Sequence, residues 1–153
     1  MSVDRNSAQM TLTLRPATEA DAQLLFDWRN DPVTRRNSLD TAEIVWHDHL
    51  RWLGASLSRS DRRLLIAEQG LDPVGTVRLD HAGDQCILSW TVAPSRRGRG
   101  IGKAMVRRAV AEAGVATLFS SIKDDNIASI RIAEGCGFKR ASCSNGLALY
   151  RLG

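Results

Sequence analysis

The sequence is poor in aromatic residues and has no long apolar run. Aromatic residues make up 5% of the 153 residues, and Tyr150 is the single tyrosine. No apolar segment approaches the roughly 20 residues that a membrane-spanning helix needs. The N-terminus also lacks the basic and then apolar pattern of a secretory signal. We therefore expect a cytoplasmic protein without a membrane partner.

Cysteine is scarce as well, which excludes a disulfide-based fold. Cys86, Cys136 and Cys143 form no CxxC pair, and their number is odd. Such spacing does not predict a metal site or a redox pair. We interpret all three as reduced, buried thiols of a cytoplasmic protein, and we expect no bound metal.

Lysine is rare, so arginine carries most of the positive charge. The net charge is +4 and the isoelectric point is about 9.4. A basic surface can meet nucleic acid or a phosphorylated small molecule. The sequence has neither a run of like charges nor interleaved aromatic and basic residues. We therefore do not expect nucleic acid as a partner.

Length and composition predict one globular domain over residues 11–153. Hydrophobic residues make up 43% and charged residues 25% of the chain, which are ordinary values for a globular protein. Residues 1–10 show no apolar periodicity, and we expect them to be disordered.

Apolar periodicity predicts the order β-α-α-β-β-β-α-β-α-β-β. This order predicts a mixed, mostly antiparallel sheet of six to seven strands flanked by four helices. The fold class is α/β, more narrowly α+β. Strands are expected at 11–15, 64–68, 74–80, 86–92, 116–122, 138–143 and 147–151. Helices are expected after Thr18, after a cap at Asp40 or Thr41, from about Arg99 to Gly114, and from a cap at Asp124 or Asp125 to Gly135. The second helix is expected to present the apolar stripe Trp46, Leu50, Leu53 and Leu57.

The most informative segment is a glycine-rich turn between strand 86–92 and the helix after it. Gly98, Gly100 and Gly102 lack side chains, so backbone N–H groups there can approach a ligand closely. The helix N-terminus adds unpaired donors and partial positive charge. Together these features indicate a pyrophosphate site, and Arg97 and Lys103 add charge around it.

The letters of this turn exclude two other phosphate motifs. The pattern GxGxxG fails because Lys103 or Met105 stands at the third glycine, and Walker A fails at Arg97 and Ala104. The segment does fit [Q/R]xxGx[G/A], with Arg97, Gly100 and Gly102 at the fixed positions. That pattern resembles the coenzyme A pyrophosphate loop of the GNAT superfamily.

Two later segments strengthen this resemblance, which covers residues 11–151. The run 125–129 (DNIAS) resembles the GNAT segment N-x-x-A/S, and 135–138 (GCGF) resembles the later G-F. The resemblance implies a GNAT fold and direct transfer of acetyl from acetyl-CoA to a primary amine, without a metal. It implies a cosubstrate site formed by Trp90, Thr91, Val92, Arg97, Gly98, Arg99, Gly100, Ile101, Gly102, Lys103, Asn126 and Ser129. For Asn126, a role as helix cap is the alternative.

The acid and the base that such a transfer uses are less well marked. Many GNAT members carry an acidic tyrosine five residues before the G-F phenylalanine, and Ala133 stands there. For the acid, three alternatives remain open: Ser129, a water molecule, or departure of the thiolate without an acid. For the base, Ser89 could hold a relay water, or His49 could act with its ordinary pKa of about 6.5. A packing role beside Trp52 is the alternative for His49.

The first third of the chain resembles the acceptor lobe of a particular GNAT group. The run 28–32 (WRNDP) and the segment 75–80 (GTVRLD) are similar to the UDP-aminosugar N-acetyltransferases of pseudaminic-acid biosynthesis, which acetylate a 4-amine. Ribosomal-type protein N-terminal acetyltransferases share these residues loosely. The resemblance implies acceptor contacts from Trp28, Arg29, Asn30 and Arg78. Arginines could bind two phosphates bidentately, and tryptophans could stack on a base or sugar.

Three functions therefore stay open from the sequence. The first is acetylation of a small-molecule amine, a nucleotide-linked aminosugar. The second is acetylation of a protein or peptide amine, which should need an open, acidic pocket. The third is a non-catalytic acyl-CoA sensor, which the missing tyrosine keeps in play. A homodimer is compatible with each of them.

Overall fold

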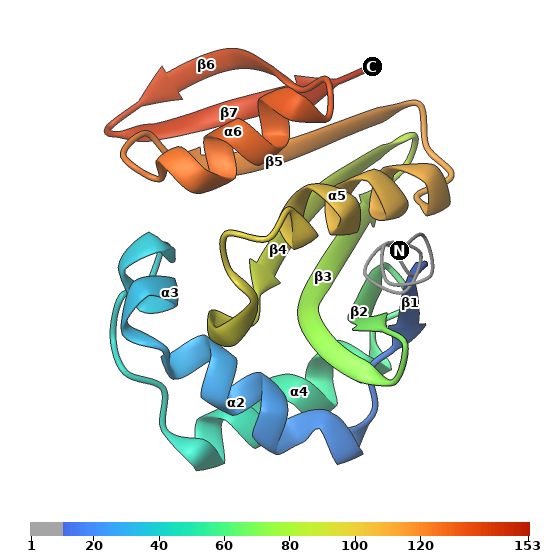
Figure 1. Ribbon diagram of the computed structural model, residues 1–153, viewed down its shortest axis with the longest axis vertical. Helices are drawn as coiled ribbons and strands as arrows, with labels where there is room; N and C mark the ends of the chain where they lie inside the picture. The colour runs from blue at the N-terminus through green and yellow to red at the C-terminus, as the bar shows by residue number, and fades with distance from the viewer. Residues whose placement is uncertain (1–10) are drawn as a thin grey trace, which may run out of the picture.

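Seven strands form one mixed sheet in the order β1-β2-β3-β4-β5-β7-β6 (Figure 1). The computed structural model describes residues 11–153, so the disorder expected for residues 1–10 concerns a segment outside the described residues. The α+β fold and the seven-stranded sheet expected from the sequence are confirmed. Five α-helices accompany the sheet in this part of the chain, one more than predicted.

Six neighbouring strand pairs make up the sheet, and only β4 and β5 are parallel. The strands are β1 (Leu12–Pro16), β2 (Arg62–Gln69), β3 (Asp72–Ala82), β4 (Gln85–Val92), β5 (Thr117–Lys123), β6 (Lys139–Ser144) and β7 (Leu147–Leu152). The helices are η1 (Glu19–Asp21), α2 (Ala22–Asn30), α3 (Pro32–Asn37), α4 (Trp46–Ser58), η2 (Pro94–Arg96), α5 (Ile101–Glu112) and α6 (Ile127–Gly135).

The helix missed by the sequence reading is α3. The run Asn30-Asp31-Pro32 ends α2, as expected, but the same residues also begin the next helix. Pro32 stands at its first turn, and the Asp31 carboxylate accepts a hydrogen bond from the Thr34 N–H at 3.1 Å. Proline suits this position because its missing N–H is one that helix geometry leaves unpaired. A proline that breaks one helix can therefore start another.

Two predicted helix caps are wrong by a few residues. The helix α4 begins at Trp46 after Val45, so neither Asp40 nor Thr41 caps it. Asp40 instead accepts from the Ala42 N–H at 3.0 Å within the preceding loop. The cap of α6 is Asn126, which accepts from the Ser129 N–H at 3.3 Å, and not Asp124 or Asp125. Side chains of this type close local turns as readily as they cap helices, so spacing alone does not separate the two.

The apolar stripe predicted for α4 is also offset. His49, Leu53 and Ser56 are the buried residues of this helix. Trp46 and Leu50, which the prediction placed inside, are 39% and 42% exposed. The buried face follows steps of four and three residues, as expected for a helix, but it starts at the histidine.

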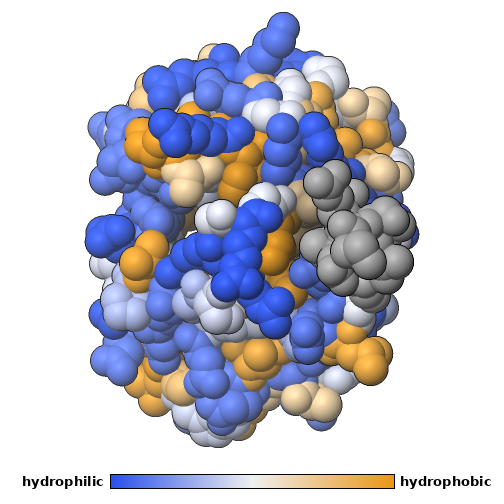
Figure 2. Space-filling view, in the orientation of Figure 1, coloured by the Kyte–Doolittle hydropathy of each residue, from blue (hydrophilic) through white to orange (hydrophobic). Residues whose placement is uncertain are grey.

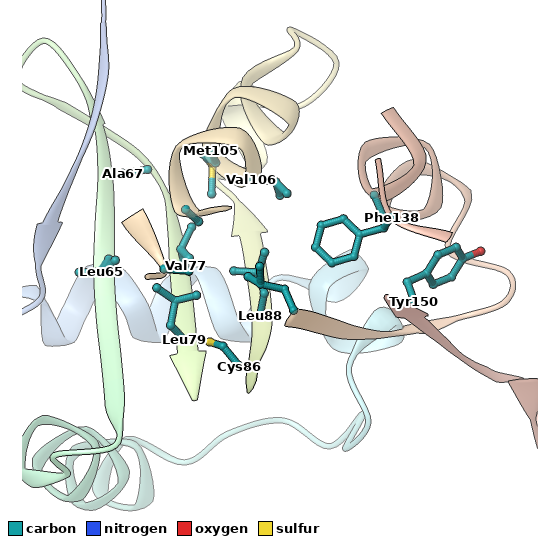
Figure 3. Close-up of a cluster of buried hydrophobic side chains, with 14 of the residues drawn as sticks. Leu65, Ala67, Val77, Leu79, Cys86, Leu88, Met105, Val106, Phe138 and Tyr150 are labelled. Atoms are coloured by element: carbon teal, nitrogen blue, oxygen red, sulfur yellow. The ribbon is translucent and has the colours of Figure 1, made fainter. Parts of the chain in front are cut away.

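The core lies on both faces of the sheet. Along β2, Leu65 and Ala67 belong to one buried cluster, whereas Leu64 and Ile66 belong to the other. In the larger cluster, Met105 and Val106 of α5 pack towards the strands, and Phe138 and Tyr150 extend it to the C-terminal hairpin (Figure 3). The smaller cluster joins β2 to α2 and α4. The predicted inner stripe of α5 is confirmed, since Ile101, Met105, Ala109 and Ala113 are all buried.

The three thiols differ in their surroundings. Burial raises the pKa of Cys86 to about 11, which keeps this thiol protonated. Cys136 is half-buried and Cys143 is exposed, so the prediction of three buried thiols holds for Cys86 alone. Within residues 11–153, none of the helices combines the length and apolarity needed to cross a bilayer.

Candidate active site

The central feature of the molecule is a split between the two parallel strands. Strand β4 pairs with β5 only at Gln85–Thr117, Cys86–Leu118 and Ile87–Phe119. Beyond these pairs β4 continues to Val92 and β5 to Lys123, and the strands diverge (Figure 1). The second half of β4 thus keeps β3 on one edge and presents free backbone groups on the other. An extended ligand can bind such an edge as an added strand.

A cavity of about 590 Å³ occupies this split. Its floor comes from Ser89, Trp90 and Thr91 of β4, and its far wall from 120–123 of β5. Residues of α2, α3 and the loop before α4 complete it, together with Asn126 and Ser129 of the α6 turn. The face of the molecule in Figure 2 is largely hydrophilic, with hydrophobic residues in scattered patches. The cavity joins the carboxyl ends of two parallel strands, which is where α/β sheets place ligands.

The glycine-rich turn follows β4 and η2 and leads directly into α5. Gly98 and Gly100 have φ of +75° and +76°, which favour glycine. Gly100 caps the helix without a side chain, and the first helical hydrogen bond runs from the Ala104 N–H to the Gly100 oxygen at 3.3 Å. The N–H groups of Ile101, Gly102 and Lys103 precede that bond, so helix geometry leaves them unpaired. This arrangement suits an anion at the N-terminus of a 12-residue helix.

Gly102 has a packing role that the sequence did not predict. A Cβ at this position would lie 2.5 Å from Ile132 Cδ1 and 3.1 Å from Val92 Cγ2. The absence of a side chain therefore lets α5 pack closely against α6 and β4.

The predicted cosubstrate residues divide between the cavity and the turn. Trp90, Thr91, Asn126 and Ser129 line the cavity, whereas Val92 packs against the larger core cluster. The residues 97–103 lie outside the cavity, at the end of the loop that leaves β4. The indole Nε1 of Trp90 is buried without a hydrogen-bond partner in residues 11–153.

A family model identifies the domain. The model for the acetyltransferase (GNAT) domain matches residues 11–139. The chain belongs to the GNAT acetyltransferase family. It is an N-acetyltransferase whose cosubstrate is acetyl-CoA. No group of three or more potential metal ligands occurs in residues 11–153.

Solved structures share the fold at low identity. An acetyltransferase from Thermus thermophilus has a TM-score of 0.81 at 23% identity, covering 94% of this chain and 97% of its own. A spermidine N-acetyltransferase from Vibrio cholerae, in complex with CoA and spermine, has a TM-score of 0.81 at 15% identity over 92% and 93%. AAC(6')-Ib in complex with ribostamycin and coenzyme A has a TM-score of 0.80 at 22% identity over 92% of each chain. No curated protein matches the sequence. These likenesses establish the fold of this GNAT protein and leave its acceptor open.

Two neighbouring guanidinium groups line the cavity, those of Arg29 of α2 and Arg78 of β3. Burial, and then the charge of Arg78, lower the pKa of Arg29. Arg78 lies 3.1 Å from an Asp80 oxygen, yet its Nε has no well-formed hydrogen bond. The guanidinium of Arg29 lies over Trp52, 4.1 Å from the ring centre.

Two other predicted acceptor residues have structural partners instead. Trp28 is 7% exposed, belongs to the smaller core cluster and does not line the cavity. The side-chain amide of Asn30 donates to the Ile44 carbonyl at 2.8 Å and accepts from the Ile44 N–H at 2.7 Å. Trp28 therefore packs α2 against the sheet, and Asn30 anchors the loop that forms the outer wall of the cavity.

The histidine suggested as a base is fully buried. His49 is 0% exposed, and both ring nitrogens have partners, the Ala22 carbonyl at 2.8 Å and an Arg29 nitrogen at 3.2 Å. Burial lowers its pKa, the hydrogen bond to Ala22 opposes this, and the charge of Arg29 lowers it further. His49 also stacks on Trp52. Both ring nitrogens are therefore engaged inside the protein, and neither faces the cavity to take a proton from an amine.

Of the other residues considered for proton transfer, two serines reach the cavity. Ser89 lines it from β4 and Ser129 from α6, so both remain candidates. Ala133, at the position of the family tyrosine, is buried inside α6. Tyr150 is 1% exposed in the core and does not reach the cavity. Neither position therefore supplies a tyrosine hydroxyl to the cavity.

Sequence reasoning missed the contacts that close the cavity. Lys123 at the end of β5 donates to the Arg36 carbonyl of α3 at 2.9 Å. On the other side, Arg97 donates to Asp31 at 2.6 Å and to the Thr34 hydroxyl at 3.0 Å. The helix α3 is thus tied to both arms of the split. A signal for these contacts is lacking in the sequence, because each joins residues more than 60 positions apart.

Proposed function

We propose that this GNAT enzyme acetylates the amine of a small anionic acceptor, a nucleotide-linked aminosugar. The observation that carries the proposal is the pair Arg29 and Arg78 on one wall of the cavity. No carboxylate of residues 11–153 lies within ion-pair distance of Arg29. A half-buried guanidinium without a counter-ion is unfavourable unless a ligand supplies the anion.

The charge of the whole cavity agrees with an anionic acceptor. Its lining contains the cations Arg29, Arg35, Arg78 and Lys123 and the carboxylates Asp40 and Asp80. Asp80 is already paired with Arg62 at 2.6 Å and with Arg78 at 3.1 Å. A polycationic amine would meet net repulsion here, whereas a diphosphate can take two bidentate arginine contacts.

Trp52 supplies the second element of the acceptor site. It lines the cavity, and its ring already carries the Arg29 guanidinium on one face. An aromatic ring next to a cation offers contact area for a nucleobase or a sugar face. The volume of about 590 Å³ lies within the usual range for a small-molecule site.

The chemistry follows from the free edge of β4. When acetyl-CoA is bound, its thioester is the electrophile that the acceptor amine attacks. The backbone N–H groups at the free edge of 88–92 are fixed donors for the carbonyl oxygen, on which negative charge develops. Ser89 and Ser129 are placed to hold a water or a proton near the reacting groups.

Release of the CoA thiol with a panel of amines tests the proposal. The panel contains a UDP-linked aminosugar, the same sugar without the nucleotide, spermidine, an aminoglycoside and a peptide with a free N-terminus. We expect the UDP-linked sugar to have the highest kcat/KM, about tenfold or more above the free sugar, because only the former reaches both arginines. Equal use of spermidine or the peptide contradicts the proposal. If no amine in the panel raises thiol release above background, the result contradicts the proposal and favours the alternative of an acyl-CoA sensor.

A further inference from the structure

We propose that His49 is a positioning residue, which as a neutral, buried imidazole holds Arg29 in place for the anionic part of the acceptor. The inference rests on the proposed function, because it assigns Arg29 to an acceptor anion. His49 itself is 0% exposed and does not line the cavity. It can therefore act on the acceptor only through another side chain.

The hydrogen-bond partners of His49 fix its tautomer. Nε2 lies 2.8 Å from the Ala22 carbonyl, which can only accept, so Nε2 carries the proton. Nδ1 lies 3.2 Å from Arg29 Nη1, which can only donate, so Nδ1 keeps its lone pair. A neutral imidazole satisfies both partners at once. A protonated imidazole would place an N–H against the arginine N–H and a positive charge against the guanidinium.

The same guanidinium is held from a second direction. Its carbon lies 4.1 Å from the centre of the Trp52 ring, and His49 stacks on that ring at 5.9 Å with an angle of 24°. The histidine fixes the edge of the guanidinium and the tryptophan supports its face. A long side chain that is held in this way loses less rotamer freedom when it binds an anion, and the anion binds more tightly.

The surroundings of His49 keep the ring neutral. Phe26 of α2 lies 5.3 Å from it, and Trp46 of α4 lies 5.8 Å from it, so much of its contact surface is aromatic. Arg29 faces it from α2 and is the charged side chain that acts on it. Burial and this charge both favour the neutral form. The ring therefore accepts a proton only below the usual histidine range, and the contact with Arg29 breaks there.

Two substitutions separate positioning from packing. In His49→Asn, the amide oxygen can take the place of Nδ1 and accept from Arg29. In His49→Gln, the amide nitrogen can take the place of Nε2 and donate to Ala22, but the acceptor for Arg29 is lost. Both variants remove the ring, so packing is weakened in each. The matched pair differs in which of the two hydrogen bonds can be kept.

Binding of UDP to the CoA-saturated protein is the first measurement, by titration calorimetry at pH 7.5. We expect about tenfold weaker UDP binding in His49→Gln and within about threefold of the original affinity in His49→Asn, with CoA affinity unchanged in both. Equal losses in the two variants, or no loss in His49→Gln, overturn the positioning role. As the pH is lowered, UDP affinity should fall more steeply in the unaltered protein than in His49→Asn, because protonation of the UDP phosphate weakens binding in both and loss of the His49–Arg29 contact adds to it only in the former.

A second readout separates failure of this inference from failure of the proposed function. The ring nitrogen shifts of His49 by NMR report the tautomer without any acceptor, and we expect the proton on Nε2. If UDP does not bind but inorganic pyrophosphate does and still separates the two variants, the positioning role stands and the nucleotide acceptor is wrong. If the proton lies on Nδ1, or neither anion binds the CoA-saturated protein, the positioning role is wrong.

Discussion

The two proposed halves of the active site are built in different ways. The proposed donor half uses backbone: a free strand edge over 88–92 and unpaired N–H groups at the start of α5. The proposed acceptor half uses side chains from several elements, with Arg29 on α2, His49 and Trp52 on α4, and Arg78 on β3. A backbone site depends on local conformation, whereas a side-chain site depends on the tertiary packing of distant segments.

Because of this difference, we expect the two halves to tolerate amino-acid substitutions to different degrees. All members of a family that share a donor can keep one backbone geometry, because backbone groups are the same in every sequence. An acceptor site made from side chains can be exchanged without disturbing the fold. The fold likeness to a spermidine N-acetyltransferase at 15% identity therefore carries no information about the acceptor of this chain.

The largest expected effect comes from changing the donor turn. Gly100 has φ of +76°, so Gly100→Val forces the turn out of its conformation at a cost of about 1–3 kcal/mol. The N–H groups that follow would no longer point at one place. We expect the dissociation constant for acetyl-CoA to rise by more than about 100-fold, because several hydrogen bonds to the diphosphate are lost together. Titration calorimetry measures this.

Gly114→Val is the matched control for the donor turn. Gly114 has φ of +66° and open space around it, and it follows the other end of α5. The backbone strain is comparable, so the loss of stability should be similar, while acetyl-CoA affinity should stay within about twofold. If both variants lose acetyl-CoA binding alike, the effect comes from helix stability and the turn is not the anion site.

A smaller effect is expected from removing one acceptor cation. Arg29→Met keeps much of the side-chain volume over Trp52 and removes the charge. We expect KM for the acceptor to rise by about tenfold to 100-fold, as for a lost charge-assisted hydrogen bond, with KM for acetyl-CoA unchanged. Steady-state kinetics with both substrates varied provides the measurement.

Arg36→Met makes the same change in charge outside the cavity. Arg36 lies on α3, and its carbonyl rather than its side chain makes the contact with Lys123. Kinetics of this variant should match the original protein. A shared rise in acceptor KM would show that long-range charge, and not contact with Arg29, attracts the acceptor.

The smallest effect concerns the contact that joins the two halves. Arg97 belongs to the donor loop but pairs with Asp31, the cap of α3. Burial raises the pKa of Asp31, but the hydrogen bonds from Arg97 and Thr34 and the charge of Arg97 outweigh it, so the pKa is lowered overall. This contribution to stability is present above the unfolded pKa and is lost as the pH falls through the folded value. Arg97→Ala should lower the Tm by at most about 4 °C at neutral pH.

Comparison with Arg96→Ala shows whether α3 is involved. Arg96 pairs with Asp72 at 3.5 Å and makes no ion pair with α3. We expect Arg97→Ala to raise the acceptor KM by about threefold and Arg96→Ala to leave it unchanged, since only the former loosens the cavity wall. A thermal melt at pH 7 and at pH 3 should show that the difference between Arg97→Ala and the original protein shrinks in acid.

The sequence allowed the strands and the donor turn to be predicted because their signals are local. Alternation predicted strand 86–92, in which Cys86 and Leu88 are buried, and the glycines after it predicted the turn in which Gly98 and Gly100 have positive φ. The helix starts near Asp40 and Asp124 were wrong. Asp40 closes a local turn, and Asn126, not a neighbouring aspartate, caps α6.

The acceptor site could be predicted only in part. Arg29 and Arg78 were found from a family resemblance, and both line the cavity. Trp28 and Asn30 came from the same run of sequence, yet one packs in the core and the other binds the backbone of Ile44. Adjacent residues on a helix point in different directions, so a run of letters mixes cavity residues with structural ones. The pairing of His49 with Arg29 depends on how α2 and α4 pack, which local spacing does not encode.

A crystal structure of the protein with bound CoA tests the central claim most directly. We expect the diphosphate to accept hydrogen bonds from the backbone N–H groups of 98–103, and the pantetheine arm to lie along the free edge of β4. The sulfur should then face the cavity between Ser89 and Ser129. A diphosphate bound anywhere else, with those N–H groups turned away from it, contradicts the account.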